Sequence, residues 1–183
     1  MLTVCGYEAT SDDSVLKDRV SPAQREVIEK CLEQRINSRI PLPYILGHGY
    51  FAGLRFICDS SALVPRSPLA ELILNDYQPW WRPKPGARIL DLCCGGGSIG
   101  IAAATYRPDV QVLMTDLDEA ALTLARENLR HHGLEDRVQA VSSDLFDAFP
   151  ATRFDLILSN PPYVNADDLA SMPAEFRVEP ELA

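Results

Sequence analysis

From Arg88 onward the chain alternates between short apolar segments and helix-like segments, and this alternation limits the possible folds more than any other feature. Four apolar segments predict strands: 88–93, 110–115, 137–142 and 154–159. Between them, residues 98–106 and 118–132 have the apolar spacing of helices. Strands that alternate with helices form parallel sheets with right-handed crossovers. We therefore expect an α/β domain whose functional residues lie at the carboxyl ends of its strands.

The chain before Arg88 predicts a small helical and β-hairpin region. In the segment SPAQREVIEKCLEQRINSRI, Ser21 can cap a helix that begins at Pro22, and Gln24 completes a capping box. The segment YFAGLRFICD alternates well enough to predict a short hairpin that turns at Ala52 and Gly53.

A second helix is expected in this front region, followed by a joint. The segment PLAELILNDYQPWW predicts a helix that opens at Pro68. The proline-rich RPKPGA that follows is typical of a connection between parts of a chain. We therefore expect residues 1–82 to form an N-terminal helical and hairpin region and residues 83–183 to form the α/β domain.

A glycine-rich loop lies between the first expected strand of that domain and its helix. The sequence ILDLCCGGGSIGIA holds Gly95, Gly97 and Gly100 in G-x-G-x-x-G spacing. Glycine lets a ligand approach the backbone, and the free N–H groups of a helix start attract a carboxylate or phosphate. A simple strand-to-helix turn explains the glycines about as well, so neighbouring residues must decide.

Two carboxylates favour an adenosine-bearing cofactor. Asp116 follows the second strand, about twenty residues beyond the first glycine, where a carboxylate can accept hydrogen bonds from ribose hydroxyls. Asp116 could instead belong to a helix cap, but Asp118 is the better candidate for that role. Asp91, inside the first strand, suits the ammonium group of S-adenosylmethionine better than a pyrophosphate, which favours that cofactor over a nicotinamide dinucleotide. A buried structural aspartate is the alternative for Asp91.

The third expected strand ends in SSDLF and adds Asp144 to the same edge of the sheet. Its carboxylate can accept a hydrogen bond from an adenine amine, although a polar strand end is an equally good interpretation. Leu117 and Leu145 directly follow Asp116 and Asp144, and we include both in the expected cofactor site.

The fourth expected strand runs into the sequence LILSNPPYVN. Asn-Pro-Pro also suits a simple turn. However, Pro161 and Pro162 lack N–H groups and leave a rigid rim of carbonyl acceptors. The Asn160 side-chain oxygen and the Pro161 carbonyl can then accept both hydrogens of an NH2 group, while Tyr163 packs on its flat face. Such a grip directs the nitrogen lone pair towards an incoming methyl group, so Asn160, Pro161, Pro162 and Tyr163 are the expected catalytic residues.

The pattern D-x-x-x-G-x-G-x-x-G, the later Asp116 and NPPY together resemble the class I S-adenosylmethionine-dependent methyltransferases that modify nitrogen. Nearly the whole chain is similar to the HemK-type protein-(glutamine-N(5)) methyltransferases. Its PRSPLAEL segment resembles the PrmB-type branch, which acts on a large-subunit ribosomal protein, more than the release-factor branch. The resemblance implies a Rossmann-like class I sheet with a substrate-recognition region before it.

The resemblance also implies roles for individual residues. S-adenosylmethionine would be surrounded by the cofactor-site residues: Asp91, Gly95, Gly97, Gly100, Asp116, Leu117, Asp144, Leu145 and Asn160. A substrate glutamine amide would be held by Asn160 to Tyr163, with Phe51 and Arg66 nearby.

The implied function is methylation of a glutamine side-chain amide in a basic ribosomal protein of the large subunit. Three alternatives remain open: methylation of a release-factor glutamine, methylation of an exocyclic amine in nucleic acid, and a cofactor-binding fragment without activity. The fragment without activity is an alternative because family members carry a seven-stranded sheet, whereas four strands are predicted here. We therefore expect a C-terminally incomplete sheet, in which the fourth strand is an exposed edge.

The composition of the chain further limits the kinds of partner that we expect. A formal net charge of −9 disfavours a protein that mainly grips nucleic-acid backbone and suits a basic protein partner. Five cysteines without C-x-x-C spacing predict reduced thiols, and the three histidines add no metal-site pattern, so we expect no metal. No membrane segment or signal peptide is evident in the sequence, which makes the cytoplasm the expected location.

Overall fold

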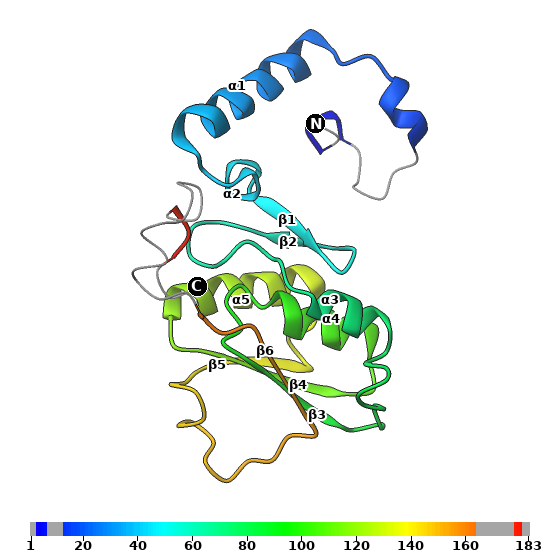
Figure 1. Ribbon diagram of the computed structural model, residues 1–183, viewed down its shortest axis with the longest axis vertical. Coiled ribbons are helices and arrows are strands. Elements are labelled where there is room, and N and C mark those ends of the chain that lie inside the picture. Colours follow the sequence, from blue (N-terminus) through cyan, green and yellow to red (C-terminus); the bar gives the residue numbers. More distant parts are fainter. Residues whose placement is uncertain (1–2, 7–12, 164–177, 181–183) are drawn as a thin grey trace.

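The structure is a computed structural model that describes residues 3–6, 13–163 and 178–180. Figure 1 shows its elements in successive layers: a sheet, the helices that pack on it, a small hairpin above these helices, and a long helix farthest from the sheet. None of the helices in these described ranges is long and apolar enough to cross a membrane.

The central sheet has four parallel strands in the order β5-β4-β3-β6. Their bounds are β3 Arg88–Leu92, β4 Gln111–Asp116, β5 Val138–Ser142 and β6 Leu156–Ser159. All four expected strands are confirmed within two residues at each end, and so is the α/β fold class. β6 is an edge of the sheet in the described part of the chain, as expected for the fourth strand.

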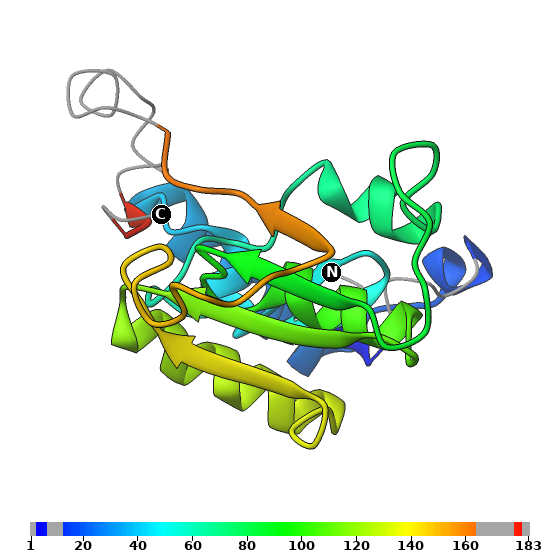
Figure 2. The same cartoon turned by 90° about the horizontal axis from the view of Figure 1, so that it is seen from below.

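Two helices cover one face of this sheet. α4 (Ser98–Tyr106) packs on β3 and β4, and α5 (Glu119–His132) packs on β4 and β5. Asp118 caps α5 by accepting a hydrogen bond from the Ala120 N–H, and Gly133 ends it in the left-handed conformation. Figure 2 views the sheet from its other face, where no helix of the described residues lies.

The front region contains the expected hairpin and capped helix. β1 (His48–Phe51) pairs with β2 (Leu54–Ile57) in antiparallel fashion, and α1 (Pro22–Ser38) carries the capping box at Ser21. The structure adds elements that the sequence analysis did not propose, namely η1 (Thr3–Cys5), η2 (Asp13–Lys17) and α2 (Leu42–Leu46).

The hairpin shares a hydrophobic core with the sheet. β2 contacts α5 and β1 contacts α4, and the buried Phe56 and Tyr77 belong to the same cluster as Ile89 and Met114. Burial of these side chains therefore stabilises both regions together. The division between residues 82 and 83 stays a prediction, and apolar packing crosses it.

The helix expected to open at Pro68 is shorter than its apolar pattern suggested. α3 spans Leu69–Leu74 and ends because the Tyr77 N–H donates to the Leu72 carbonyl at 2.8 Å. Asp76 and Tyr77 have positive φ, which turns the chain away from the helix axis. Pro79 lies shortly beyond the helix and could not have continued it.

α4 approaches the sheet closely at one glycine. A Cβ atom on Gly100 would lie 2.6 Å from Cγ of Met114 and 3.0 Å from Oδ2 of Asp91, so no larger residue fits. The Gly100 N–H donates to Asp91 Oδ2 at 2.7 Å. Asp91 is fully buried, and this burial raises its pKa to about 7, against a lowering by the Gly100 N–H and a further raising by Asp116.

Asp91 should make the stability of the fold depend on pH. Its folded pKa of about 7 lies above that of an unfolded aspartate, so ionisation opposes folding. This cost is absent below about pH 4, grows towards pH 7 and is complete above it. Relative to Asp91→Asn, the parent should lose up to about 1.4 kcal/mol of unfolding free energy per pH unit in that range. Urea unfolding at pH 5 to 8 measures this; a constant difference between the two proteins would contradict it.

Leu122 tests the packing of α5 on the sheet. Its side chain is fully buried, so Leu122→Ala should lower the free energy of unfolding by about 2–5 kcal/mol. Glu127→Ala on the exposed side of the same helix is the matched control and should change it by less than about 0.5 kcal/mol. Equal effects in urea unfolding would show that α5 does not pack as described.

Candidate functional site

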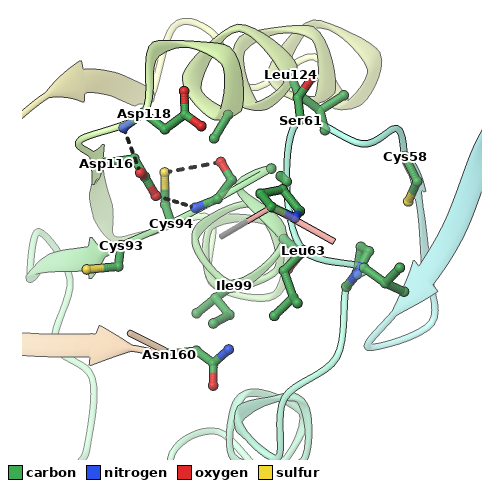
Figure 3. A pocket seen from close by; sticks show the side chains of 18 of the residues that line it. Cys58, Ser61, Leu63, Cys93, Cys94, Ile99, Asp116, Asp118, Leu124 and Asn160 are labelled. Atoms are coloured by element: carbon green, nitrogen blue, oxygen red, sulfur yellow. Dashed lines mark hydrogen bonds between the residues drawn. The ribbon is translucent and has the colours of Figure 1, made fainter. Parts of the chain in front are cut away.

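A cavity that is open to solvent lies between the carboxyl end of the sheet and the loop that follows β2. We call residues 58–66 the roof loop. Figure 3 shows the roof-loop residues Cys58, Ser61 and Leu63 across the cavity from Asp116, Cys93 and Asn160. The sheet-side wall is formed chiefly by Cys93, Cys94, Gly95, Gly96, Ser98, Ile99, Asp116, Asp118, Asn160 and Pro162.

The Asp116 carboxylate is fixed by two backbone N–H groups (Figure 3). Its Oδ2 accepts from the Gly95 N–H at 2.8 Å, and its Oδ1 accepts from the Asp118 N–H at 3.0 Å. Each carboxylate oxygen can accept more than one hydrogen bond, so Asp116 keeps acceptor capacity for a ligand. The glycine loop and this aspartate are therefore joined in the structure, and the contact of Asp116 with a ribose stays a prediction.

The expected glycines divide into two groups. Gly95 lines the cavity together with Gly96, whereas Gly97 and Gly100 do not. Gly97 has a φ of +82°, and a Cβ there would lie 3.1 Å from Cε of Met114 and 3.2 Å from Cβ of Ala125. Gly97 and Gly100 thus allow close packing beneath the loop, and a contact between them and a cofactor stays a prediction.

Asn160 is the first residue after β6 and lines the cavity. The Ser159 hydroxyl donates to the Leu92 carbonyl at 2.7 Å and so joins the end of β6 to β3. This bond fixes the backbone directly before Asn160. Pro162 also lines the cavity, whereas Pro161 and Tyr163 lie outside its lining, and Tyr163 is 82% exposed.

The other expected cofactor residues do not line the cavity. Asp91 is buried beneath the glycine loop, and its Oδ1 has no hydrogen-bond partner among the described residues. Asp144, Leu117 and Leu145 are exposed at the ends of their strands. Their roles stay predictions.

Phe51, expected near the substrate, lies elsewhere in the structure. It is 4% exposed and packs in the core beside Phe56, with ring centroids 6.5 Å apart. The strand alternation correctly predicted β1, but it did not decide which side chains face the core. Phe51 does not line the cavity and takes a core position instead.

Arg66 lines the cavity as expected and forms an ion pair that the sequence did not suggest. Its guanidinium donates to Glu179 Oε2 at 2.5 Å, and the Glu179 side chain is nearly buried. Pro180 lines the cavity beside this pair. A second contact holds the roof loop, since the Tyr44 hydroxyl donates to the Ala62 carbonyl at 2.6 Å.

The cavity thiols are poor nucleophiles. Burial raises the pKa of Cys94 well above its usual value and also raises that of Cys93, while the pKa of Cys58 rises to about 11. Thiols with raised pKa stay protonated near neutral pH. Among the described residues, no group of three or more His, Cys, Asp or Glu side chains could hold a metal ion.

Sequence reasoning missed most of the roof loop and the polar residue Asn128, which borders the cavity from α5. Asn128 could have been noticed, because it is a polar residue on the apolar face of its helix, one residue before Leu129. The roof loop gives no such signal, since its position depends on contacts with distant parts of the chain.

The chain matches the family described as "Methyltransferase small domain" over residues 73–175. It is 43% identical over 173 residues to a ribosomal protein uL3 glutamine methyltransferase of Francisella tularensis, covering 94% of this chain and 55% of that protein. A protein of the same name from Bordetella pertussis is 40% identical over 172 residues, covering 93% of this chain and 58% of that protein.

The chain spans little more than half the length of these curated relatives. One solved structure, the tRNA m1G37 methyltransferase of M. jannaschii, is 18% identical with a TM-score of 0.50, covering 63% of this chain and 35% of that one. This last likeness concerns the fold alone. The family expected from the glycine loop, Asp116 and NPPY is confirmed: the chain belongs to the methyltransferase small domain family.

Proposed function

We propose that the protein transfers a methyl group from S-adenosylmethionine to a glutamine side-chain amide of ribosomal protein uL3. The observation that carries this proposal is the common cavity, since Asn160 at the end of β6 lines the same space as Asp116 and the glycine loop. A methyl donor and an amide acceptor bound there would lie within reach of each other. The named relatives support the choice of acceptor.

The residues present fit S-adenosylmethionine. Asp116 has acceptor capacity for ribose hydroxyls and is held in place by Gly95 and Asp118. The buried Asp91 has an unpartnered carboxylate oxygen among the described residues, and a nearby cationic group would favour its ionised form. When bound, S-adenosylmethionine supplies a methyl group activated by a sulfonium charge.

The NPPY segment holds the amide. Asn160 accepts one amide hydrogen on its side-chain oxygen, and the Pro161 carbonyl accepts the other. Positioning of this kind can contribute several kcal/mol to catalysis, up to about 7–11 in favourable models. Held in this way, the amide nitrogen would face the methyl group that S-adenosylmethionine would supply, and the amide proton released on transfer would leave to solvent. Tyr163 is exposed, so its ring is available to pack against the acceptor chain.

The protein acceptor is also favoured by charge. Ribosomal proteins are generally basic, because they bind nucleic-acid phosphates, and a net charge of −9 attracts a basic partner. Neither of the two relatives described above is named for a release factor. A ribosomal acceptor places the reaction in the cytoplasm.

Transfer of labelled methyl groups to purified uL3, release factor and DNA tests the acceptor. We expect labelling of uL3. Labelling of release factor or DNA instead would show that this molecule, and not uL3, is the acceptor. Binding of S-adenosylhomocysteine without any transfer would support the inactive cofactor-binding fragment.

Asn160→Ala tests the grip on the amide. Loss of the side-chain acceptor should lower transfer to uL3 by about 100-fold or more. The affinity for S-adenosylhomocysteine, measured by calorimetry, should change by less than about threefold, because Asn160 would act mainly on the acceptor. Asn75→Ala, at an exposed asparagine that follows α3, is the matched control and should leave both values unchanged. An equal loss of transfer and affinity would overturn this role for Asn160.

A further inference from the structure

Asn128 is a buried polar residue on the apolar face of α5. Its side chain is 1% exposed and makes three hydrogen bonds. Oδ1 accepts from the Ile57 N–H at 2.8 Å, while Nδ2 donates to the Ile57 carbonyl at 3.2 Å and to the Gly96 carbonyl at 3.0 Å. A carboxamide has only two hydrogens to donate, so both are used within the protein.

These bonds join the two walls of the cavity. Gly96 belongs to the glycine loop, and Ile57 is the last residue of β2, directly before the roof loop. The contact is reinforced by packing, because the buried Ala62 of the roof loop lies against Ala121 and Leu124 of α5. One side chain therefore bonds to one backbone group of the glycine loop and to two directly before the roof loop, which carries Arg66, the residue expected near the substrate.

α5 binds the outer edge of β2 at a second place. His132, one turn after Asn128, lies with Nε2 2.9 Å from the Arg55 carbonyl, and its ring packs on Phe56 at 4.9 Å between centroids. His132 thus holds the same strand edge as Asn128 but makes no hydrogen bond to the glycine loop. Both residues anchor the hairpin, but only Asn128 links the two walls of the cavity. A comparison of the two therefore distinguishes one effect from the other.

We propose that Asn128 is a positioning residue that fixes the glycine loop relative to the roof loop, and so couples cofactor binding to acceptor binding. The identity of the two ligands rests on the proposed function. Since both donor hydrogens of Asn128 are used, it acts through Gly96 and Ile57. It differs in this from Asp116 and Asn160, which are assigned to the ligands themselves.

Asn128→Asp removes the link with little change of shape. The aspartate still has an oxygen to accept from the Ile57 N–H, but it loses both donors and places a carboxylate oxygen near two carbonyl oxygens. A buried polar contact broken in this way costs more than the bond itself contributes. The roof loop and the glycine loop should then separate or tilt, and the Asp116 and Gly95 groups should lose their alignment with a ligand.

Calorimetry with S-adenosylhomocysteine, thermal unfolding and the Michaelis constant for uL3 test the proposal. For Asn128→Asp we expect the dissociation constant to rise about tenfold, together with a higher Michaelis constant for uL3 and a lower Tm. His132→Ala is the matched control: it should also lower Tm and raise the Michaelis constant, but change the dissociation constant by less than about twofold. Asn128→Ala, which adds no charge, should behave like Asn128→Asp and serves if the latter does not fold.

An unchanged dissociation constant in the Asn128 variants would overturn the proposal, as would an equal rise in His132→Ala. The binding measurement also separates this proposal from the proposed function. If the parent binds S-adenosylhomocysteine but does not methylate uL3, the acceptor assignment fails, while the comparison of dissociation constants still decides the role of Asn128.

Discussion

The hydrogen bond from the Gly100 N–H to the buried Asp91 carboxylate is the contact on which the site depends most. It brings α4 so close to the sheet that a Cβ atom at this position would collide with Met114. Because the glycine loop runs from the end of β3 into the start of α4, fixing this helix also fixes the loop. Asp116 of the next strand holds the loop at its other end through Gly95. Two carboxylates on neighbouring strands thus set the backbone that faces the cavity.

The parallel sheet and its sheet-side wall were predictable because their signals are local. Strand periodicity, the spacing of the glycines and the aspartate after β4 all lie within short stretches of sequence, and the structure brings Gly95, Asp116 and Asn160 to one cavity as expected. The end of α3 was less predictable. A helical apolar pattern continued past Leu74, but turn hydrogen bonds around Tyr77 ended the helix.

The roof loop was not predictable, because its position is set by contacts between residues far apart in the sequence. The Tyr44 hydroxyl reaches the Ala62 carbonyl, and Asn128 reaches Ile57 across 71 positions. The burial of Phe51 was also not predictable from local sequence. Alternation located its strand, but only packing against Phe56 decided that it belongs to the core. The front hairpin is therefore part of the same packed unit as the sheet, and one wall of the cavity is built on it.

The two prolines after Asn160 have a consequence for selectivity between side chains of equal size. Pro161 and Pro162 have carbonyl oxygens and no N–H, so on the proposed function this rim would favour a guest that brings its own hydrogens. A glutamine amide brings two, whereas a glutamate carboxylate of nearly the same shape brings none and carries a negative charge towards these oxygens. Sites built to pair with a donor can reject a look-alike without it by factors of about 10⁴–10⁵. On the proposed function, the missing N–H groups would therefore let the protein distinguish an amide from its deamidated product.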